Sequence, residues 1–237
     1  DIGQRILNSA NNKKIKIYDE STVQSIKRYN KSLLVSTNKS TIVTDLVIFA
    51  IGRIPNISSL NLDNAKIKLT SQSAIKVNKL SQTNIKNIFA LGDVTNRKNL
   101  TPVAIREAVH LVNYFLYRNK NSLDYDKIAS AIFTQPEVGS IGLGENDLKK
   151  RNIPYKVLQT EFKPLKYAFS KKINKVFIKV LYQPKTEKIF GIIYIGDSAA
   201  EIIQSIAISF AKNFTLNDLR NTIPVHPTSA EELVTLV

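Results

Sequence analysis

Two short apolar runs, each closed by a glycine, restrict the folds open to this 237-residue chain more than any other feature. One lies within residues 45–51 and is followed by Gly52, and the other covers residues 88–91 and is followed by Gly92. A run that is apolar on both faces is typical of a strand buried between two layers, as in a parallel sheet. The runs therefore predict a mixed α/β fold with buried strands at these positions.

The residues directly after these strands are candidates for ligand contacts, because open α/β sheets bind nucleotides beyond the carboxyl ends of their strands. Gly52 begins a loop there, although an ordinary strand-ending turn accounts for this glycine by itself. Asp93 follows the second strand and can hydrogen-bond a ribose-like hydroxyl, or equally cap its own loop. The local pattern leaves both alternatives open.

A helix is predicted to follow the second strand, with Thr101 as its N-cap and Pro102 at the first helical position. The N–H groups at a helix start are free, and the helix dipole is positive there. Together they stabilise a nearby negative charge by roughly 0.3–1 kcal/mol. The start of this helix is therefore a candidate site for an anionic group.

The other elements are predicted from apolar periodicity. Helices are expected over residues 1–12, 101–115, 145–151, 199–214 and 216–220, and strands over residues 14–18, 21–29, 31–37, 41–43, 129–134, 155–162, 176–182 and 189–195. Residues 135–142 hold two glycines and a proline and are predicted to be turns. The second half of the chain is thus expected to be an antiparallel α+β unit.

The last dozen residues contain His226, one of only two histidines in the chain. Thr228 is a good N-cap for a final helix, and Glu231 three residues later completes a capping box. Glu231 would lie on the first helical turn and could turn back towards His226. A carboxylate that accepts an imidazole proton prepares the other ring nitrogen for acid/base work. A purely structural capping box accounts for the same residues.

Composition excludes several classes of protein. The chain has no cysteine, so a disulfide framework or a thiolate metal site is ruled out within it, and no metal site is predicted. No apolar run approaches the roughly 20 residues that span a bilayer. The net charge of +15 is spread along the chain, which indicates a solvated surface rather than a specific nucleic-acid site. A cytoplasmic location is the expectation.

Five separated stretches occur in a characteristic order along the chain: Ala50–Asn56, Ala90–Val94, Leu100–Ile105, Phe133–Leu143 and Val225–Thr235. Their order and spacing resemble the C-terminal half of the pyridine nucleotide–disulfide oxidoreductases, in particular the branch that reduces glutathione disulfide. The resemblance covers essentially the whole chain. It implies an end of the NADPH-binding domain at 1–55, a returning segment of the FAD-binding and central domain at 56–125, and a dimerisation domain at 126–237.

The resemblance also implies cofactor contacts. Asp93 matches the aspartate that binds the ribitol chain of FAD, and Thr101 matches the residue whose backbone N–H meets the pyrimidine edge of the flavin. Gly52 and the neighbourhood of Asn99 match positions near the nicotinamide nucleotide of NADPH. The assignment of Thr101 agrees with the helix-dipole argument, because reduced flavin carries negative charge at that edge.

The terminal pair has an implied catalytic role. His226 matches the acid/base that protonates the departing glutathione thiolate, and Glu231 matches the carboxylate that orients it. In the family this pair serves the active site of the partner subunit, so a homodimer is expected. The implied sequence of steps is hydride transfer from NADPH to FAD, reduction of a cysteine pair, and attack of the thiolate on glutathione disulfide.

The chain departs from the family pattern in two ways. The redox cysteines, the glycine-rich dinucleotide loop and the basic pair that selects NADPH all precede, in the family, the position matching Asp1. A missing N-terminal part is therefore expected, and with it inactivity of the chain by itself. Val109 stands where some relatives carry an arginine for a glutathione carboxylate. The alternatives are a related reductase for another disulfide, with dihydrolipoamide dehydrogenase disfavoured by the ending, or a non-catalytic dimerisation remnant.

Overall fold

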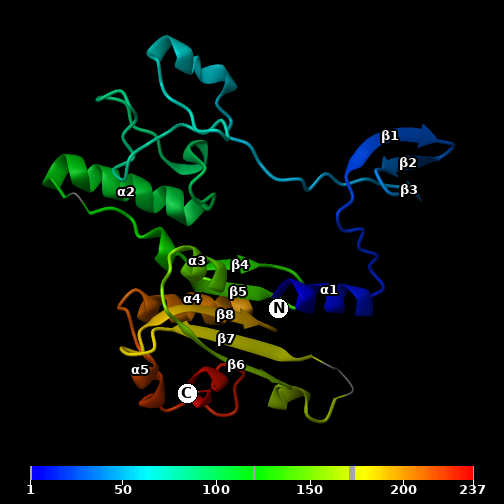
Figure 1. The fold of residues 1–237 in the computed structure, drawn as a ribbon, viewed down its shortest axis with the longest axis vertical. Coiled ribbons are helices and arrows are strands. Elements are labelled where there is room, and N and C mark those ends of the chain that lie inside the picture. Colours follow the sequence, from blue (N-terminus) through cyan, green and yellow to red (C-terminus); the bar gives the residue numbers. More distant parts are fainter. Residues whose placement is uncertain (1, 120, 171–173, 237) are drawn as a thin grey trace. The chain divides into compact units, whose positions relative to one another are not determined.

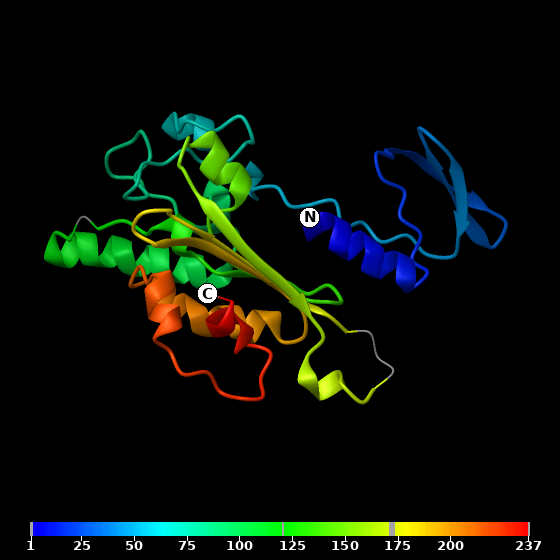
Figure 2. The ribbon, with the colours of Figure 1, turned by 60° about the horizontal axis from the view of Figure 1, so that its bottom comes forward.

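The computed structural model describes residues 2–119, 121–170 and 174–236 (Figures 1 and 2). These residues form two compact units. The sheet unit comprises the chain up to Ile17 together with the chain from Asp126 onwards, and the loop unit comprises Tyr18–Tyr125. Each unit has a hydrophobic core of its own.

The sheet unit is built on five antiparallel strands in the order β4-β5-β8-β7-β6 (Figure 1). The strands are β4 Ser130–Ile132, β5 Val138–Gly142, β6 Lys156–Phe162, β7 Val176–Tyr182 and β8 Ile189–Ile195. The helices are α1 Ile2–Asn12, α3 Glu145–Lys150, α4 Ala199–Phe210, α5 Leu216–Arg220 and α6 Glu232–Thr235. The central pair is the predicted hairpin of β7 and β8, with Val180 opposite Ile192.

One face of this sheet forms the main core. Alternate residues of β7 and β8, such as Ile178, Ile192 and Tyr194, pack with α4 and with Leu233 of α6. Helix α4 contacts β4, β5 and β8 along its length. The C-terminal helix is therefore fixed to the sheet through its buried leucine.

Glycines let α4 come this close to the sheet. A Cβ atom on Gly139 would lie 2.5 Å from the backbone oxygen of Ala199, and one on Gly142 would lie 2.1 Å from the backbone oxygen of Phe190. No residue with a side chain fits at either position without displacing backbone. The prediction of turns over residues 135–142 is therefore wrong for residues 138–142, which form β5, whereas residues 135–137 lie outside the strands. The two glycines that suggested turns are needed for the close packing of this strand.

The opposite face of the sheet carries a second, smaller core and a buried ion pair. Ile2 and Ile6 of α1 pack against Phe177, and the guanidinium of Arg5 lies 3.8 Å from the centre of the Phe177 ring. Lys179 of β7 is buried and bonds to Glu145, at the start of α3. This ion pair ties α3 to the middle of the sheet.

The loop unit has little regular structure. It contains an antiparallel meander of β1 Val23–Tyr29, β2 Ser32–Thr37 and β3 Thr41–Thr44, the helix α2 Thr101–Tyr117, and 3-10 turns at Ser58–Leu60, Leu62–Ala65 and Gly92–Thr95. Its core is small, with Ile67, Ile75 and Ala90 at the centre. Two further 3-10 turns, at Tyr125–Lys127 and Leu165–Tyr167, complete the described elements.

The predicted parallel strands are wrong for the described chain. Residues 46–51 are irregular, and Leu46, Ile48 and Ile51 are 71–89% exposed. Phe89 forms only an isolated bridge with Gln82, and residues 14–18 are irregular as well. An apolar pattern indicates only that the side chains tend to be buried. A strand also requires a neighbouring strand that pairs with its backbone N–H and C=O groups. Within the residues described here, no strand pairs with the stretch 46–51.

We expect Gly139→Ala to destabilise the sheet unit, because the added methyl group must push α4 away from β5. Overpacking of this kind typically costs about 1–3 kcal/mol. Chemical denaturation followed by circular dichroism measures the effect. The matched control is Gly3→Ala in α1, where an added Cβ meets nothing within 4 Å; a loss of stability as large there as at Gly139 would contradict the packing argument.

Low pH should weaken the attachment of α3. The hydrogen bond from Lys179 holds the pKa of Glu145 below its ordinary value of 4.5, with smaller help from Tyr155. A lowered folded-state pKa contributes stability above the unfolded pKa, and that stability is lost as pH falls through the folded value. Glu145→Gln should therefore flatten the fall in unfolding free energy below about pH 4.5, whereas Glu20→Gln, at an exposed side chain, should leave the slope unchanged.

Candidate functional site

The C-terminal loop brings His226 and Glu231 into direct contact. Nδ1 of His226 lies 2.9 Å from Oε2 of Glu231, so the contact expected from the sequence is present. The imidazole is 72% exposed while the carboxylate is only 14% exposed. The backbone N–H of Glu231 donates to Oγ1 of Thr228 at 3.1 Å, which fixes the chain between the two residues.

The final helix begins later than predicted. Glu231 occupies the N-cap position of α6, and the first helical residue is Glu232. The carboxylate of Glu231 contacts His226. In a reciprocal capping box it would instead accept a hydrogen bond from the backbone N–H of Thr228. The purely structural explanation of Glu231 needs the bond from its carboxylate to the backbone of Thr228, and the carboxylate contacts His226 instead. The other half of the capping box is present, because Oγ1 of Thr228 accepts from the N–H of Glu231.

This contact sets the chemistry of the imidazole. An ionised carboxylate can only accept hydrogen bonds, so Nδ1 of His226 must carry the proton between them. In the neutral ring Nε2 is then an acceptor, and in the charged ring it is a proton donor on an exposed edge. The arrangement is suited to moving a proton to or from an external group at Nε2.

In the loop unit, Asp93 is the exposed residue of a 3-10 turn whose two end residues, Gly92 and Thr95, are buried. Oγ1 of Thr95 donates to the carbonyl oxygen of Gly92 at 2.7 Å, and the N–H of Gly92 donates to Oε2 of Glu107 at 2.7 Å. Gly92 has a φ of 71°, and a Cβ there would lie 3.2 Å from Cβ of Ala104. The turn thus packs against α2 and presents the carboxylate of Asp93 to solvent.

Glu107 is the residue of this region that sequence reasoning missed. Its side chain is 3% exposed, and Oε1 accepts hydrogen bonds from Tyr125 and from Arg97, the latter at 3.0 Å. The guanidinium of Arg97 also lies 5.3 Å from the centre of the Tyr125 ring. Burial, and then the hydrogen bond to Glu107, raise the pKa of Tyr125, so its hydroxyl remains a donor. A lone Glu in a helical stripe gives no sign in the sequence that it is buried.

Helix α2 starts without a side-chain cap. Leu100, not Thr101 as predicted, is the N-cap residue, and its apolar side chain leaves the cap position without a hydrogen-bonding group. Thr101 is the first helical residue and is exposed. Pro102 has no N–H, and the N–H of Val103 donates to the carbonyl oxygen of Leu100 at 3.0 Å, so the backbone N–H of Thr101 is the donor that this end can offer to an anion or a carbonyl group. The shift by one residue leaves that prediction intact.

Asn99 and Gly52 differ in how well they are held. Nδ2 of Asn99 donates to Oδ1 of Asn96 at 2.9 Å, while its own Oδ1 is buried without a hydrogen-bond partner in the described structure. Gly52 lies in the irregular exposed segment with a φ of 105° and no neighbour within 4 Å of its Cβ position. Asp93 and Asn99 thus lie in the chain that leads into α2 and Thr101 begins this helix, whereas Gly52 lies in the irregular exposed segment.

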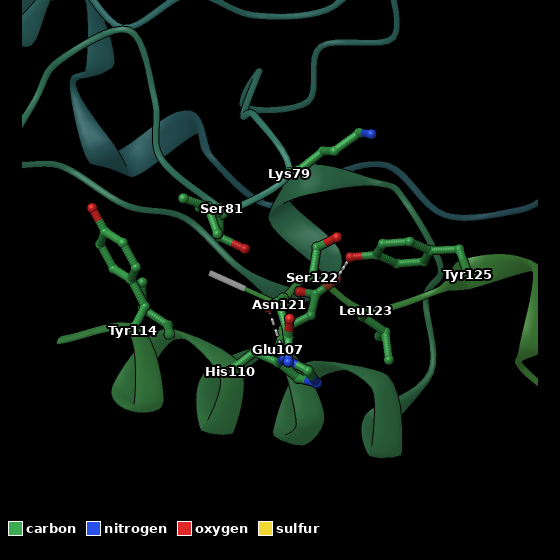
Figure 3. Close-up of a pocket in the computed structure, with 11 residues that line it drawn as sticks. Lys79, Ser81, Glu107, His110, Tyr114, Asn121, Ser122, Leu123 and Tyr125 are labelled. Atoms are coloured by element: carbon green, nitrogen blue, oxygen red, sulfur yellow. Dashed lines mark hydrogen bonds between the residues drawn. The ribbon is translucent and has the colours of Figure 1, made fainter. Parts of the chain in front are cut away.

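A small cavity lies beside Glu107 but contains none of the predicted residues (Figure 3). Its volume is about 20 Å³, which holds little more than one water molecule. His110, the other histidine, lines it and has Nδ1 3.1 Å from the backbone oxygen of Asn121. Figure 3 also shows the hydrogen bond between Tyr125 and Glu107. The cavity is too small for an organic ligand.

A wider hollow of about 1020 Å³ lies in the sheet unit, lined by α1, the connection between β4 and β5, and the adjoining ends of β6, β7 and β8. Its lining includes side chains of both charges, among them the cations Arg5 and Lys13 and the anions Glu161 and Asp197. Arg5 is already paired with Glu161, and Lys13 donates to the backbone and side-chain oxygens of Gln135. The lining of the hollow therefore mixes charges of both signs.

Comparison with known proteins identifies the class of protein. Residues 128–237 match the dimerisation domain of the pyridine nucleotide-disulphide oxidoreductases, and residues 1–108 match the domain described as pyridine nucleotide-disulphide oxidoreductase. The chain belongs to this family. The helices and sheets of its structure agree with the predicted α/β class followed by an α+β interface domain, which is confirmed.

Among curated proteins the chain is similar to glutathione reductases and to trypanothione reductase. It is 34% identical to glutathione reductase of Nostoc sp. over 251 residues (100% of this chain, 55% of the relative). It is 36% identical to the chloroplastic/mitochondrial glutathione reductase of Pisum sativum over 219 residues (92% and 40%), and 39% identical to trypanothione reductase of Trypanosoma congolense over 197 residues (83% and 40%). The chain spans about half the length of the curated relatives it matches.

Solved structures show the same fold. The chain aligns with LpdA of Mycobacterium tuberculosis at a TM-score of 0.85 and 21% identity, covering 97% of this chain and 50% of that one. It aligns with the HOCl-induced flavoprotein disulfide reductase RclA of Escherichia coli at a TM-score of 0.86 and 21% identity, covering 99% and 53%. At this identity the likeness concerns the fold. No helix in the described ranges has the length and apolar character to cross a membrane.

Replacing Glu107 with Gln should loosen the turn that carries Asp93. The change keeps the size of the side chain but removes the charge that holds Arg97 and the N–H of Gly92. Hydrogen bonds to charged groups contribute about 1.5–3 kcal/mol each, so unfolding free energy should fall by at least that much.

Hydrogen exchange at the Gly92 amide is the direct measurement, and it should become faster in Glu107→Gln. Asp93→Asn is the control, because it alters the same turn at an exposed carboxylate and leaves Glu107 in place. Unchanged exchange at Gly92 in Glu107→Gln would show that the buried carboxylate does not hold the turn.

Proposed function

We propose that this chain is part of a flavoprotein disulfide reductase that uses NADPH to reduce glutathione disulfide. Its membership in the pyridine nucleotide-disulphide oxidoreductases supports an oxidoreductase with FAD and a nicotinamide nucleotide. The observation that carries the proposal is the hydrogen bond between Nδ1 of His226 and the mostly buried carboxylate of Glu231. It gives the chain an oriented acid/base on an exposed edge, which a purely structural module does not need.

In this proposal His226 holds and moves the proton of the disulfide step. When a disulfide is cleaved, one sulfur departs as a thiolate and must be protonated. Protonated His226 donates from Nε2, while Glu231 accepts from Nδ1 and stabilises the charged ring. General acid catalysis by a positioned side chain typically contributes about 10²–10⁴-fold. The 237 residues contain no cysteine, so the thiols of the reaction must come from elsewhere.

The residues ahead of α2 fit a flavin. Asp93 is exposed at a fixed turn, and the start of α2 has no side-chain cap. FAD, when bound, supplies the two-electron chemistry between nucleotide and disulfide. We assign Asp93 to its ribitol hydroxyls and the backbone N–H of Thr101 to its pyrimidine edge. Asn99 and Gly52 are assigned to the neighbourhood of NADPH.

Glutathione disulfide is the proposed substrate, ahead of a related disulfide. The glutathione reductases of Nostoc sp. and Pisum sativum support this choice, and the net charge of +15 would steer an anionic substrate towards the protein. Trypanothione reductase of Trypanosoma congolense, at 39% identity, makes another glutathione-like disulfide the second candidate. Some relatives have an arginine at the position of Val109, which contacts a carboxylate of glutathione. In this chain another residue would have to make that contact.

We further propose that the working protein is a homodimer in the cytoplasm. The dimerisation-domain match over residues 128–237 supports self-association. In a dimer of this family the His226 loop would serve the site of the partner subunit. The contrasting possibility, a dimerisation module without catalysis, predicts that the His226–Glu231 contact can be removed without any loss of activity in the assembled protein.

The experiment is a kinetic comparison in the full gene product that carries this chain. His226→Ala should lower turnover of glutathione disulfide by about 10²–10⁴-fold, while reduction of the flavin by NADPH keeps its rate, since that half-reaction needs no proton at this site. Stopped-flow absorbance separates the two half-reactions. His110→Ala is the matched control, because the other histidine lines only the small cavity beside Glu107. Equal turnover in the two variants would remove His226 from the mechanism.

A further inference from the structure

A mostly buried arginine follows the turn that carries Asp93, and the proposed reaction gives this arginine no part. Arg97 lies two residues beyond the end of the turn, which covers Gly92–Thr95. Its side chain is only 20% exposed. A charged side chain is rarely shielded from water in this way unless it is paired. The partners of Arg97 therefore indicate why an arginine occupies this position.

The guanidinium of Arg97 contacts three buried side chains. Nε donates to Oγ1 of Thr95 at 3.2 Å, and Nη2 donates to Oγ of Ser81 at 3.0 Å and lies 3.0 Å from Oε1 of Glu107. The aromatic ring of Tyr125 has its centre 5.3 Å from the guanidinium carbon. A guanidinium presents donors on separate nitrogens in one rigid plane, whereas a lysine has all its donors on a single nitrogen. These contacts therefore require an arginine.

The contacts of Arg97 close a network of hydrogen bonds around the turn. Because an arginine can only donate, the oxygen of the Thr95 hydroxyl accepts from Arg97, and its proton goes to the carbonyl oxygen of Gly92 at 2.7 Å. The N–H of Gly92 donates to Oε2 of Glu107, whose other carboxylate oxygen contacts Arg97. Each end residue of the turn is thus bound to one member of a buried ion pair.

The network matters because of what the turn presents. Asp93 is the second residue of the turn, and its side chain is exposed, so the direction of its carboxylate depends on the backbone of the turn. A group that binds a ligand must be held to within about 0.5 Å of the productive geometry. Glu107 binds the first residue of the turn, and the last residue is bound by Arg97.

We propose that Arg97 is a positioning residue for Asp93, acting through Thr95 and together with Glu107. With both ends of the turn fixed, the carboxylate of Asp93 keeps one direction for the ribitol hydroxyls to which it is assigned. Without the bond from Arg97, the second end of the turn can open while the first end remains bound to Glu107. The consequence for FAD rests on the proposed function, whereas the effect on the turn requires no cofactor.

The first test measures hydrogen exchange by NMR in the full gene product that carries this chain, freed of flavin. Arg97→Lys keeps a positive charge beside Glu107 but has no donor at the position of Nε, so it should loosen the turn. The amide of Asn96 donates to the carbonyl oxygen of Asp93 at 3.1 Å and reports on the turn. Its exchange should become several-fold faster in Arg97→Lys.

Thr95 supplies a matched pair of variants. Thr95→Val lacks the hydroxyl that Arg97 binds and should speed exchange at Asn96 as Arg97→Lys does, whereas Thr95→Ser keeps the hydroxyl and should exchange like the unaltered protein. In the double variant of Arg97→Lys and Thr95→Val, exchange should be no faster than in Thr95→Val. A further control is Arg106→Lys, the same replacement at an exposed side chain of α2.

The second test measures the dissociation constant for FAD by flavin fluorescence. It should rise several-fold in Arg97→Lys and stay unchanged in Arg106→Lys. Asp93→Asn should raise it as well, and adding Arg97→Lys to Asp93→Asn should then change it little, because Arg97 acts through Asp93. An equal rise with and without the Asp93 carboxylate would overturn the proposal.

The two tests separate this proposal from the proposed function. Unchanged exchange at Asn96 in both Arg97→Lys and Thr95→Val would show that Arg97 does not position the turn. Faster exchange with an unchanged dissociation constant for FAD would support the positioning of the turn and contradict the assignment of Asp93 to FAD. Should Arg97→Lys not fold, the comparison of Thr95→Val with Thr95→Ser decides by the same measurements.

Discussion

The close packing of α4 against the five-stranded sheet is the constraint on which the functional end of the chain depends. Gly139 leaves room for the backbone of Ala199, and this contact brings one face of β5, β7 and β8 into a continuous core. The same core receives Leu233 of α6, four positions before the end of the sequence. A loop with an exposed imidazole can keep one conformation only because the residue following it is buried in a rigid body.

Both candidate sites use a shielded carboxylate to hold an exposed group. Glu107 accepts from the N–H of Gly92 and thereby fixes the turn that presents Asp93, and Glu231 accepts from the ring that presents Nε2 of His226. A carboxylate away from water forms stronger hydrogen bonds than an exposed one, but it must be satisfied to be tolerated. Glu107 is satisfied by three partners, which include Arg97 and Tyr125. In each site, a mostly buried carboxylate thus holds the exposed group in position.

Sequence reasoning succeeded where a signal was local. Apolar periodicity located α1, α2 and the β7–β8 hairpin within a few residues, and the short polar helix α3 was also predicted. The spacing of His226 and Glu231 predicted a contact that exists. It failed where the outcome depends on distant residues. The apolar stretch 46–51 lacks a pairing strand in the described structure, and β5 was hidden because its glycines serve contacts with Ala199 and Phe190. Glu107 was missed for the same reason, since its partners lie 10 and 18 positions away.

The candidate groups are divided between the two units, and this division separates two kinds of chemistry. Asp93, Asn99 and Thr101 belong to the loop unit, and His226 and Glu231 belong to the sheet unit. The first set offers hydroxyl-binding, amide and helix-terminal groups, which suit the recognition of a nucleotide cofactor. The second offers an oriented proton donor, which suits a departing thiolate. The two sets are held by separate contacts: Leu233 in the core of the sheet unit anchors the helix after the His226 loop, and Glu107 holds the turn that presents Asp93. The reaction proposed above would draw on both units.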